Sequence, residues 1–222
     1  MLAQYEIPVA YSMVELAQQS AKLAPQPFQE YMCYWTAFNN IYTTIAERKG
    51  YFARIRTQKD GTIRTRENGS VLIPEVEMAL KERDEIDLAY NEFSEPLKKK
   101  LISHPSTKFF VKRTPKWHGF EIQFDENKQK LNGVINVKYT IDDKYPVWSP
   151  IDFGAYERYI QDKATPDDIN LLSRQLIFLV YTVRNNTFHG GKRADDANDR
   201  EVIEKALPLL KMIVESFMSK AG

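Results

Sequence analysis

The stretch from Phe28 to Arg48 constrains the fold more than any other part of this sequence. Apolar and aromatic side chains recur in it at steps of three and four residues, which is the spacing of one face of an α-helix. Because the stripe is wide and rich in large rings, the sequence predicts a helix buried in a core and ended by Gly50. The stripe consists of Tyr31, Tyr34, Trp35, Phe38, Ile41, Tyr42 and Ile45.

Four further stretches have a helix-like spacing of apolar residues. The stretch that begins at Asp167 has an N-cap region around that residue and is ended by Gly190-Gly191. In the last stretch, which ends at Lys220, Pro208 predicts a kink. Together with the first helix they predict a mainly helical chain. The four stretches run from Tyr11 to Leu23, from Pro74 towards Ile102, from Asp167 to His189 and from Asp199 to Lys220.

Two segments depart from this pattern. Between positions 51 and 73, two alternating runs flank Asp60-Gly61, which predicts an exposed hairpin. Between positions 105 and 150, short runs rich in β-branched and aromatic residues predict a small β insertion. The hairpin runs are 53–57 and 62–66, and the runs of the insertion are 109–111, 120–124 and 134–139.

Length and composition place these elements in one folded unit. The chain has 222 residues, of which 43% are hydrophobic and 27% charged, a balance that excludes wholesale disorder. We therefore expect a single domain over residues 1–222. Its fold class is mainly α, an antiparallel helical bundle with a β-hairpin and a small β insertion.

The sequence favours a reducing compartment and no bound metal. Cys33 is the single cysteine, so no internal disulfide can form, and cytoplasmic localisation is expected. The start of the chain lacks a secretory signal, and Leu176 to Val183, the most apolar stretch, is too short to span a membrane. There is no Cys-x-x-Cys or His-x-x-x-His spacing and no glycine-rich loop opening a helix, so we expect no metal and no cofactor.

The net charge of +1 says little about partners, but the basic residues are unevenly distributed. Positions 48–66 hold seven Lys or Arg against one acid, and positions 98–138 hold ten against three. These segments could form a phosphate-facing surface or could be solvated loops. On the predicted hairpin, the candidates for a phosphate-facing row are Arg54, Arg56, Arg64 and Arg66.

The predicted helix from Asp167 to His189 is apolar on two faces. At about 100° per residue, one face gathers Leu172, Leu176, Leu179, Val180 and Val183. Asn185 and His189 lie together on nearly the opposite side, with Leu171 and Phe178. The second face therefore meets either another helix of the chain or a second protomer. A two-fold contact would bring Asn185 and His189 close to their copies.

Three segments carry a resemblance to a known family. Arg184-Asn185-x-x-x-His189 resembles the signature of the HEPN family (higher eukaryotes and prokaryotes nucleotide-binding), in which an Arg and a polar residue precede a His. Trp35-Thr36-Ala37-Phe38-Asn39-Asn40-Ile41-Tyr42 is similar to the W-x-A-F-N-x-x-Y helix of some members. Asp199-Arg200-Glu201-Val202-Ile203 is similar to the start of their closing helix. The three segments in the same order are more specific than the Arg–His spacing alone.

The resemblance implies a metal-independent endoribonuclease with two motif copies at the cleft of a homodimer. Many members of the family are toxins of toxin–antitoxin pairs or antiviral effectors. RNA would then be the substrate, and an antitoxin or another regulatory protein would be a further partner. The hairpin and the β insertion have no counterpart in this resemblance.

The chemistry of the motif fits such an activity. A ribonuclease without a metal uses the 2′-hydroxyl of its substrate, so it needs a proton shuttle and a cation for the phosphate. His189 suits proton transfer because an unperturbed imidazole has a pKa of roughly 6.5. Arg184 offers a planar fork that matches phosphate oxygens, and Asn185 can orient the imidazole or the phosphate. Lys192 adds charge beyond the helix end, and Asn39 supports the motif from the neighbouring helix.

Other interpretations of the same residues stay open. A histidine ahead of a Gly-Gly helix end, such as His189, can interact with the C-terminal helix dipole alone. Arg184 can be a structural ion-pair former. The whole chain can also be a non-catalytic HEPN dimer that binds a nucleotide or a partner protein.

Overall fold

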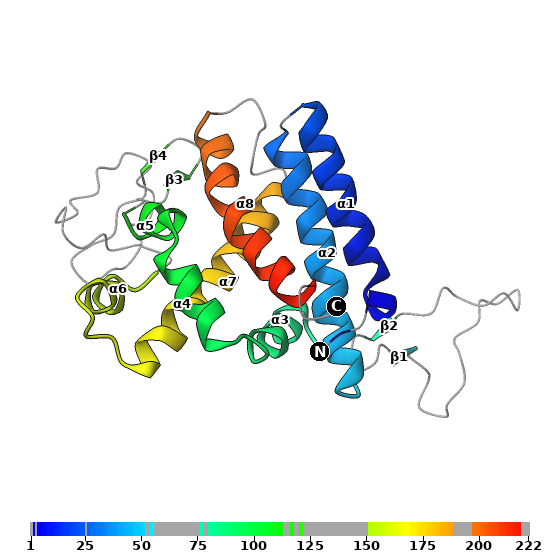
Figure 1. The fold of residues 1–222 in the computed structure, drawn as a ribbon, viewed down its shortest axis with the longest axis horizontal. Coiled ribbons are helices and arrows are strands. Elements are labelled where there is room, and N and C mark those ends of the chain that lie inside the picture. The colour runs from blue at the N-terminus through cyan, green and yellow to red at the C-terminus, as the bar shows by residue number, and fades with distance from the viewer. Residues whose placement is uncertain are drawn as a thin grey trace, which may run out of the picture.

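The computed structural model describes residues 2, 4–24, 26–51, 54–55, 76–77, 80–112, 116–117, 120–121, 151–188 and 197–218. These residues form eight α-helices, a short 3-10 helix over Gln4–Glu6 and four two-residue strands (Figure 1). The mainly helical fold predicted from the sequence is confirmed. The helices are α1 (Pro8–Leu23), α2 (Pro27–Arg48), α3 (Glu82–Tyr90), α4 (Glu95–Ser103), α5 (Pro105–Lys112), α6 (Phe153–Ile160), α7 (Pro166–Phe188) and α8 (Ala197–Met218).

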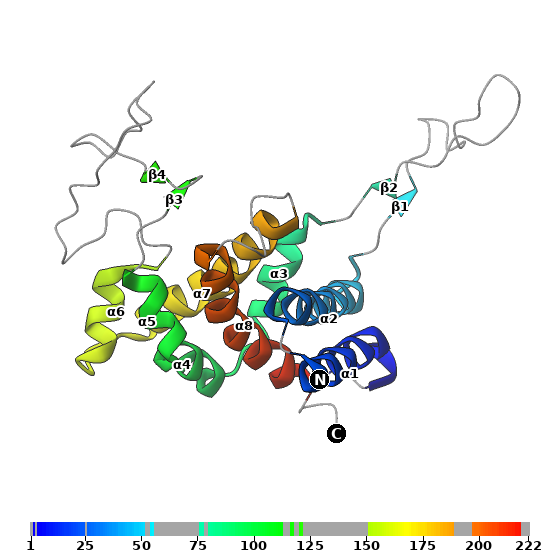
Figure 2. The ribbon, with the colours of Figure 1, turned by 90° about the horizontal axis from the view of Figure 1, so that it is seen from above.

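The helices pack as a bundle around α7. This helix contacts α3, α4, α6 and α8, and α8 also packs against α2 (Figures 1 and 2). The helices α1 and α2 lie side by side and run in opposite directions, joined by residues 24–26. None of the described helices is both long and apolar enough to cross a membrane.

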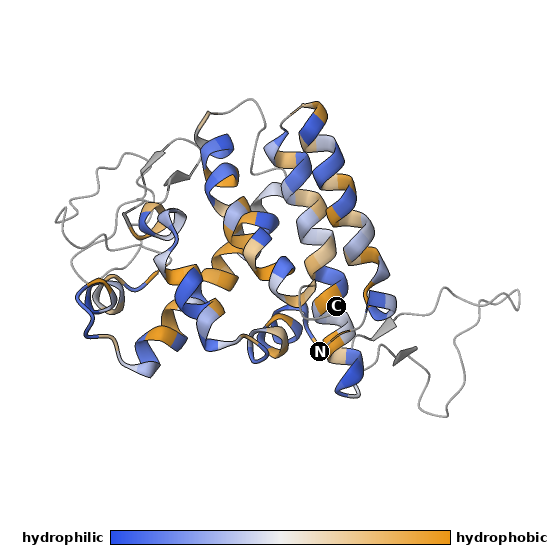
Figure 3. Cartoon of the chain, in the orientation of Figure 1, coloured by the Kyte–Doolittle hydropathy of each residue, from blue (hydrophilic) through white to orange (hydrophobic). Residues whose placement is uncertain are grey.

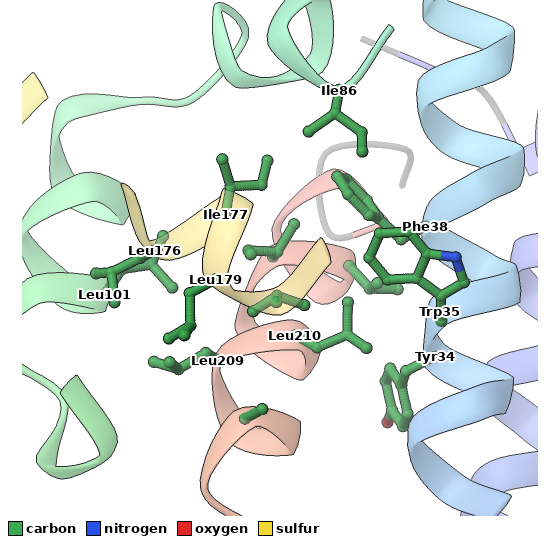
Figure 4. Close-up of a cluster of buried hydrophobic side chains, with 14 of the residues drawn as sticks. Tyr34, Trp35, Phe38, Ile86, Leu101, Leu176, Ile177, Leu179, Leu209 and Leu210 are labelled. Atoms are coloured by element: carbon green, nitrogen blue, oxygen red, sulfur yellow. The ribbon is translucent and has the colours of Figure 1, made fainter. Parts of the chain in front are cut away.

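The core is formed by the apolar stripes that the sequence predicted for α2, α7 and α8. Trp35, Phe38 and Tyr42 of α2 are buried and pack edge to face, with ring centroids 5.6 Å apart for Trp35–Phe38 and 5.2 Å for Phe38–Tyr42. Leu176 of α7 and Leu210 of α8 are fully buried on the other side of this cluster (Figure 4). The apolar stretches of α7 lie where it passes between the other helices (Figure 3).

The end of α2 confirms the stop predicted at Gly50. Gly50 has a φ of +85°, a left-handed conformation that glycine adopts without steric cost. Its N–H bonds to the Glu47 carbonyl at 2.9 Å, and the Tyr51 N–H bonds to the Ala46 carbonyl at 3.0 Å. These two bonds are those of a Schellman motif, which satisfies the last carbonyls of a helix.

The start of α7 is fixed by a reciprocal cap. The Thr165 N–H donates to Asp168 Oδ2 at 3.0 Å, and the Asp168 N–H donates to Thr165 Oγ1 at 3.2 Å. Pro166 follows the cap, where its missing N–H costs nothing. Arg158 of α6 donates its Nε–H to Asp168 Oδ2 at 3.0 Å. The N-cap is thus Thr165, two residues before Asp167, around which the sequence placed the N-cap region.

The single helix predicted from Pro74 towards Ile102 is wrong. Val76–Glu77 is strand β2, and the helical residues are divided between α3 and α4. Pro96 explains the division, because proline is tolerated in the first turn of a helix but not in its interior. The new helix begins after Ser94, whose hydroxyl accepts the Leu97 N–H at 3.4 Å.

The strand predicted at 109–111 is also wrong, because these residues belong to α5. Phe110 and Val111 are buried on the same side as Thr107, at helical spacing. The Thr107 hydroxyl donates to the Leu101 carbonyl at 2.7 Å, which ties α5 to α4. Packing against the core therefore overrides the local preference of these aromatic and β-branched residues for strands.

The helix α6 was not predicted from the sequence. Its first turn is capped by Asp152, whose Oδ1 accepts the Ala155 N–H at 2.7 Å. Only one residue of its eight, Ala155, is fully buried, so the apolar pattern that reveals longer helices is weak here.

The strands occur as two short antiparallel pairs. Strand β1 (Arg54–Ile55) pairs with β2 (Val76–Glu77), so at these residues the partner is not the predicted run 62–66. In this register Arg54 is the partner of Glu77, and Ile55 is the partner of Val76. Strand β3 (Lys116–Trp117) pairs with β4 (Phe120–Glu121), within the predicted β insertion. The runs 62–66 and 134–139 lie outside the described residues.

We expect Asp168→Asn to destabilise the fold in a pH-dependent way. The hydrogen bond from Arg158, followed by that from the Thr165 backbone, holds the pKa of Asp168 well below its usual range. A lowered folded-state pKa stabilises the protein above the unfolded pKa of about 4 and loses that effect as the pH falls below it. The urea midpoints of wild type and variant should therefore differ most near neutral pH. The difference should start to shrink below about pH 4 and be smallest at the lowest pH measured, as the pH approaches the lowered pKa of folded Asp168.

The matched control is Asp167→Asn, because Asp167 is the exposed neighbour in the same helical turn. Its midpoint should stay close to that of the wild type at both pH values. If the urea midpoints of wild type and Asp168→Asn differed by the same amount near neutral pH and at low pH, this would contradict the ionic origin of the effect.

Candidate functional site

Arg184 lies in the last two turns of α7, and its side chain is only 22% exposed. Its Nη1 donates to Asn185 Oδ1 at 2.7 Å and to Glu82 Oε2 of α3 at 3.3 Å. The guanidinium carbon is 5.5 Å from the centroid of the Trp35 ring of α2, a cation–π contact. Side chains from three helices thus surround one arginine.

Glu82 connects Arg184 to a second pair of residues on α2. Its Oε1 accepts the Tyr42 hydroxyl at 2.7 Å, and the Tyr42 oxygen in turn accepts a hydrogen bond from Asn39 Nδ2. Burial and the bond to Glu82 raise the pKa of Tyr42 far above its ordinary value, so its hydroxyl remains a proton donor. Asn39, Tyr42, Glu82, Arg184 and Asn185, which we call the arginine network, form one continuous chain of hydrogen bonds.

The structure brings three of the predicted site residues together. Arg184 and Asn185 are in direct contact, and Asn39 reaches them through Tyr42 and Glu82 rather than directly. Arg54 lies in β1, opposite Glu77. The remaining predicted site residues lie outside the described residues; they are His189, Lys192, Arg56, Arg64 and Arg66.

Sequence reasoning missed Glu82, and it placed Tyr42 in the core stripe and in the W-x-A-F-N-x-x-Y segment without assigning it a role at the site. Glu82 precedes Arg184 by 102 positions and lies in a stretch that was predicted as one long solvated helix. The ion pair agrees with the interpretation of Arg184 as an ion-pair former. The contacts to Glu82 and Asn185 both use Nη1 of the guanidinium.

The two apolar faces that the sequence predicted for α7 differ in burial. Leu172, Leu176 and Val180 are fully buried, whereas Leu171 is 42% exposed and Phe178 is half-buried. Beside the exposed face is a groove with a volume of about 260 Å³. By helical periodicity this face continues to Asn185. The groove is lined by Arg83, Leu171, Arg174, Gln175, Phe178, Leu179 and Thr182.

Two arginines flank the aromatic ring in this groove. The guanidinium carbon of Arg83 is 4.8 Å from the Phe178 ring centroid, and that of Arg174 is 5.5 Å from it. Arg174 also donates to both carboxylate oxygens of Asp87, at 2.8 and 2.7 Å. Within the part of the chain that the structure describes, no group of three or more His, Cys, Asp or Glu side chains could hold a metal ion.

Comparison with known proteins adds no relative. Neither a protein-family model, nor a curated protein, nor a solved structure matches the chain.

We expect two leucines on opposite faces of α7 to respond very differently to truncation. Leu176→Ala removes a fully buried side chain and should lower the free energy of unfolding by about 2–5 kcal/mol. Leu171→Ala should change the unfolding free energy of the monomer by less than about 0.5 kcal/mol, because that side chain is already hydrated. Urea unfolding, extrapolated to low protein concentration, measures both. Similar losses for the two variants would contradict the assignment of the open face.

Proposed function

We propose that the chain is a metal-independent endoribonuclease of the HEPN type, acting at a composite site in a homodimer. The observation that carries the proposal is the contact between the first two residues of the motif. Arg184 and Asn185 are joined at 2.7 Å, and Arg184 is further fixed by Glu82 and the Trp35 ring. A cation held in this way suits a phosphate group better than a freely rotating surface arginine does, because less entropy is lost on binding.

The proposed reaction is transesterification within the RNA strand. The 2′-oxygen attacks the adjacent phosphorus while the bond from phosphorus to the 5′-oxygen breaks, which gives a 2′,3′-cyclic phosphate and a 5′-hydroxyl. A base takes the proton from the 2′-hydroxyl, and an acid gives a proton to the departing 5′-oxygen. We assign these proton transfers to His189, charge stabilisation to Arg184, and orientation of the phosphate or the imidazole to Asn185.

The homodimer is proposed on the open face of α7. Leu171, Phe178 and Asn185 lie on this face, so a two-fold contact along it would place both copies of the motif at one cleft. Each phosphate would then meet residues from both protomers. Five basic residues are also proposed to contact the RNA backbone: Arg54, Arg56, Arg64, Arg66 and Lys192.

The proposed biological setting is a toxin–antitoxin pair or antiviral defence in the cytoplasm. A nuclease of this kind needs restraint in the cell that makes it, so an antitoxin or another regulatory protein is the proposed partner. Consistent with this setting, the wild-type chain should be harder to express than a variant with a changed motif.

We expect purified wild-type protein to cleave total RNA in excess EDTA and to leave 2′,3′-cyclic phosphate ends. His189→Ala should lower the cleavage rate by about 100-fold or more, because proton transfer typically contributes that much. Arg184→Lys should be intermediate, since it keeps the charge and loses the planar fork. DNA of the same sequence should remain intact because it lacks the 2′-hydroxyl.

The matched control is His104→Ala, at a histidine that lies between α4 and α5, outside the motif. Its cleavage rate per folded molecule should equal that of the wild type. If wild type and His189→Ala are both folded and neither cleaves RNA, the non-catalytic binding module becomes the better assignment.

We expect Leu171→Glu to convert a dimer into a folded monomer and to abolish cleavage. The substitution puts two like charges near each other across the two-fold contact and leaves the monomer core untouched. Leu16→Glu in α1 is the control, because Leu16 is 45% exposed against 42% for Leu171. Sedimentation and cleavage assays should show an active dimer for Leu16→Glu. An active dimer of Leu171→Glu would exclude this face as the interface.

A further inference from the structure

The arginine network links the proposed site to the interior of the bundle through residues that the motif does not include. Tyr42 belongs to α2, Glu82 to the first turn of α3, and Arg184 to the end of α7. The Tyr42–Glu82 bond joins α2 to α3, and the Glu82–Arg184 ion pair joins α3 to α7. The position of the guanidinium therefore depends on how all three helices pack.

Glu82 is the junction of this network because its two oxygens have separate partners. Oε1 accepts the Tyr42 hydroxyl at 2.7 Å, and Oε2 accepts Arg184 Nη1 at 3.3 Å. Because the Tyr42 hydroxyl holds one oxygen of the Glu82 carboxylate, the other oxygen is kept in a fixed orientation towards Arg184. Its location in the first turn of α3 also favours its negative charge, because a helix N-terminus is electropositive.

Tyr42 provides the rigid end of the network. Its side chain is fully buried, and its ring packs edge to face on Phe38. The hydroxyl accepts from Asn39, so its own proton is directed towards Glu82. Because burial and the bond to Glu82 raise the pKa of Tyr42, its hydroxyl keeps its proton at neutral pH.

We propose that Glu82 and Tyr42 are positioning residues for the ribonuclease reaction, and that they act by holding the Arg184 guanidinium where the phosphate binds. This inference rests on the proposed function. It also gives Asn39 a defined role, because Asn39 orients the Tyr42 hydroxyl. The rival role for Glu82 is that of a counter-ion that competes with phosphate for Arg184, and the two roles predict opposite effects on cleavage.

The test compares the steady-state cleavage of RNA by wild type, Glu82→Gln, Tyr42→Phe and Tyr31→Phe. Tyr31→Phe is the matched control, because Tyr31 is also a fully buried tyrosine of α2 and its hydroxyl donates to the Val180 carbonyl at 2.7 Å. Each tyrosine variant thus loses one buried hydroxyl, and only Tyr42 is hydrogen-bonded to Glu82. All rates are measured per folded molecule.

We expect Glu82→Gln to lower kcat by about tenfold or more and Tyr42→Phe by about three- to tenfold, with KM changed less than about twofold. Tyr31→Phe should keep the wild-type kcat even if its midpoint of unfolding falls. Equal losses of kcat in Tyr31→Phe and Tyr42→Phe would overturn the inference, since they would show a stability effect alone. A kcat that is unchanged or raised in Glu82→Gln would overturn it in favour of the competing counter-ion.

A second readout separates this inference from the proposed function. In ¹⁵N-labelled protein, the side-chain N–H signals of Arg184, assigned with Arg184→Lys, should exchange with water about tenfold faster in Glu82→Gln and Tyr42→Phe than in wild type. If the wild type cleaves no RNA, the proposed function fails, yet faster exchange in both variants would still support positioning of the guanidinium. Unchanged exchange would overturn the positioning role whether or not RNA is cleaved.

Discussion

The structure depends on placing one mostly buried positive charge, that of Arg184, at the edge of an aromatic core. Removing a guanidinium from water is unfavourable unless a counter-charge and hydrogen-bond acceptors replace the water. Glu82 and Asn185 supply the acceptors, and the Trp35 ring supplies an electron-rich face. These groups come from three helices. The geometry of the site therefore depends on how α2, α3 and α7 pack against one another.

That shared dependence explains why α7 can serve two purposes at once. Its inner face is an ordinary core stripe, and its other face is left partly open beside a groove flanked by two arginines. The reciprocal cap formed by Thr165 and Asp168 fixes the first turn of α7. The motif at the other end therefore belongs to a helix whose position is well defined. Chemistry placed on such an element is held more accurately than chemistry placed on a loop.

The long helices could be predicted from the sequence because their patterns are local and strongly periodic. The stripe of α2, its end at Gly50 and the two faces of α7 follow from residue spacing alone. The short helices could not: α5 contains strand-forming residues at 109–111 that only tertiary packing makes helical. Within the site, Arg184 and Asn185 are neighbours in sequence and were found, whereas Glu82 is 102 positions away and nothing local distinguishes it from the other acids of α3.

The separation between Glu82 and Arg184 also has a consequence during translation. Arg184 and Asn185 are the last members of the network to be synthesised, since α2 and α3 leave the ribosome long before the end of α7. Domains form their long-range contacts only after the whole segment has emerged. A nascent or truncated chain that ends before Arg184 therefore has Tyr42 and Glu82 without the cation that they hold. For the ribonuclease proposed above, this order of synthesis would keep the unfinished polypeptide inactive towards the message from which it is being made.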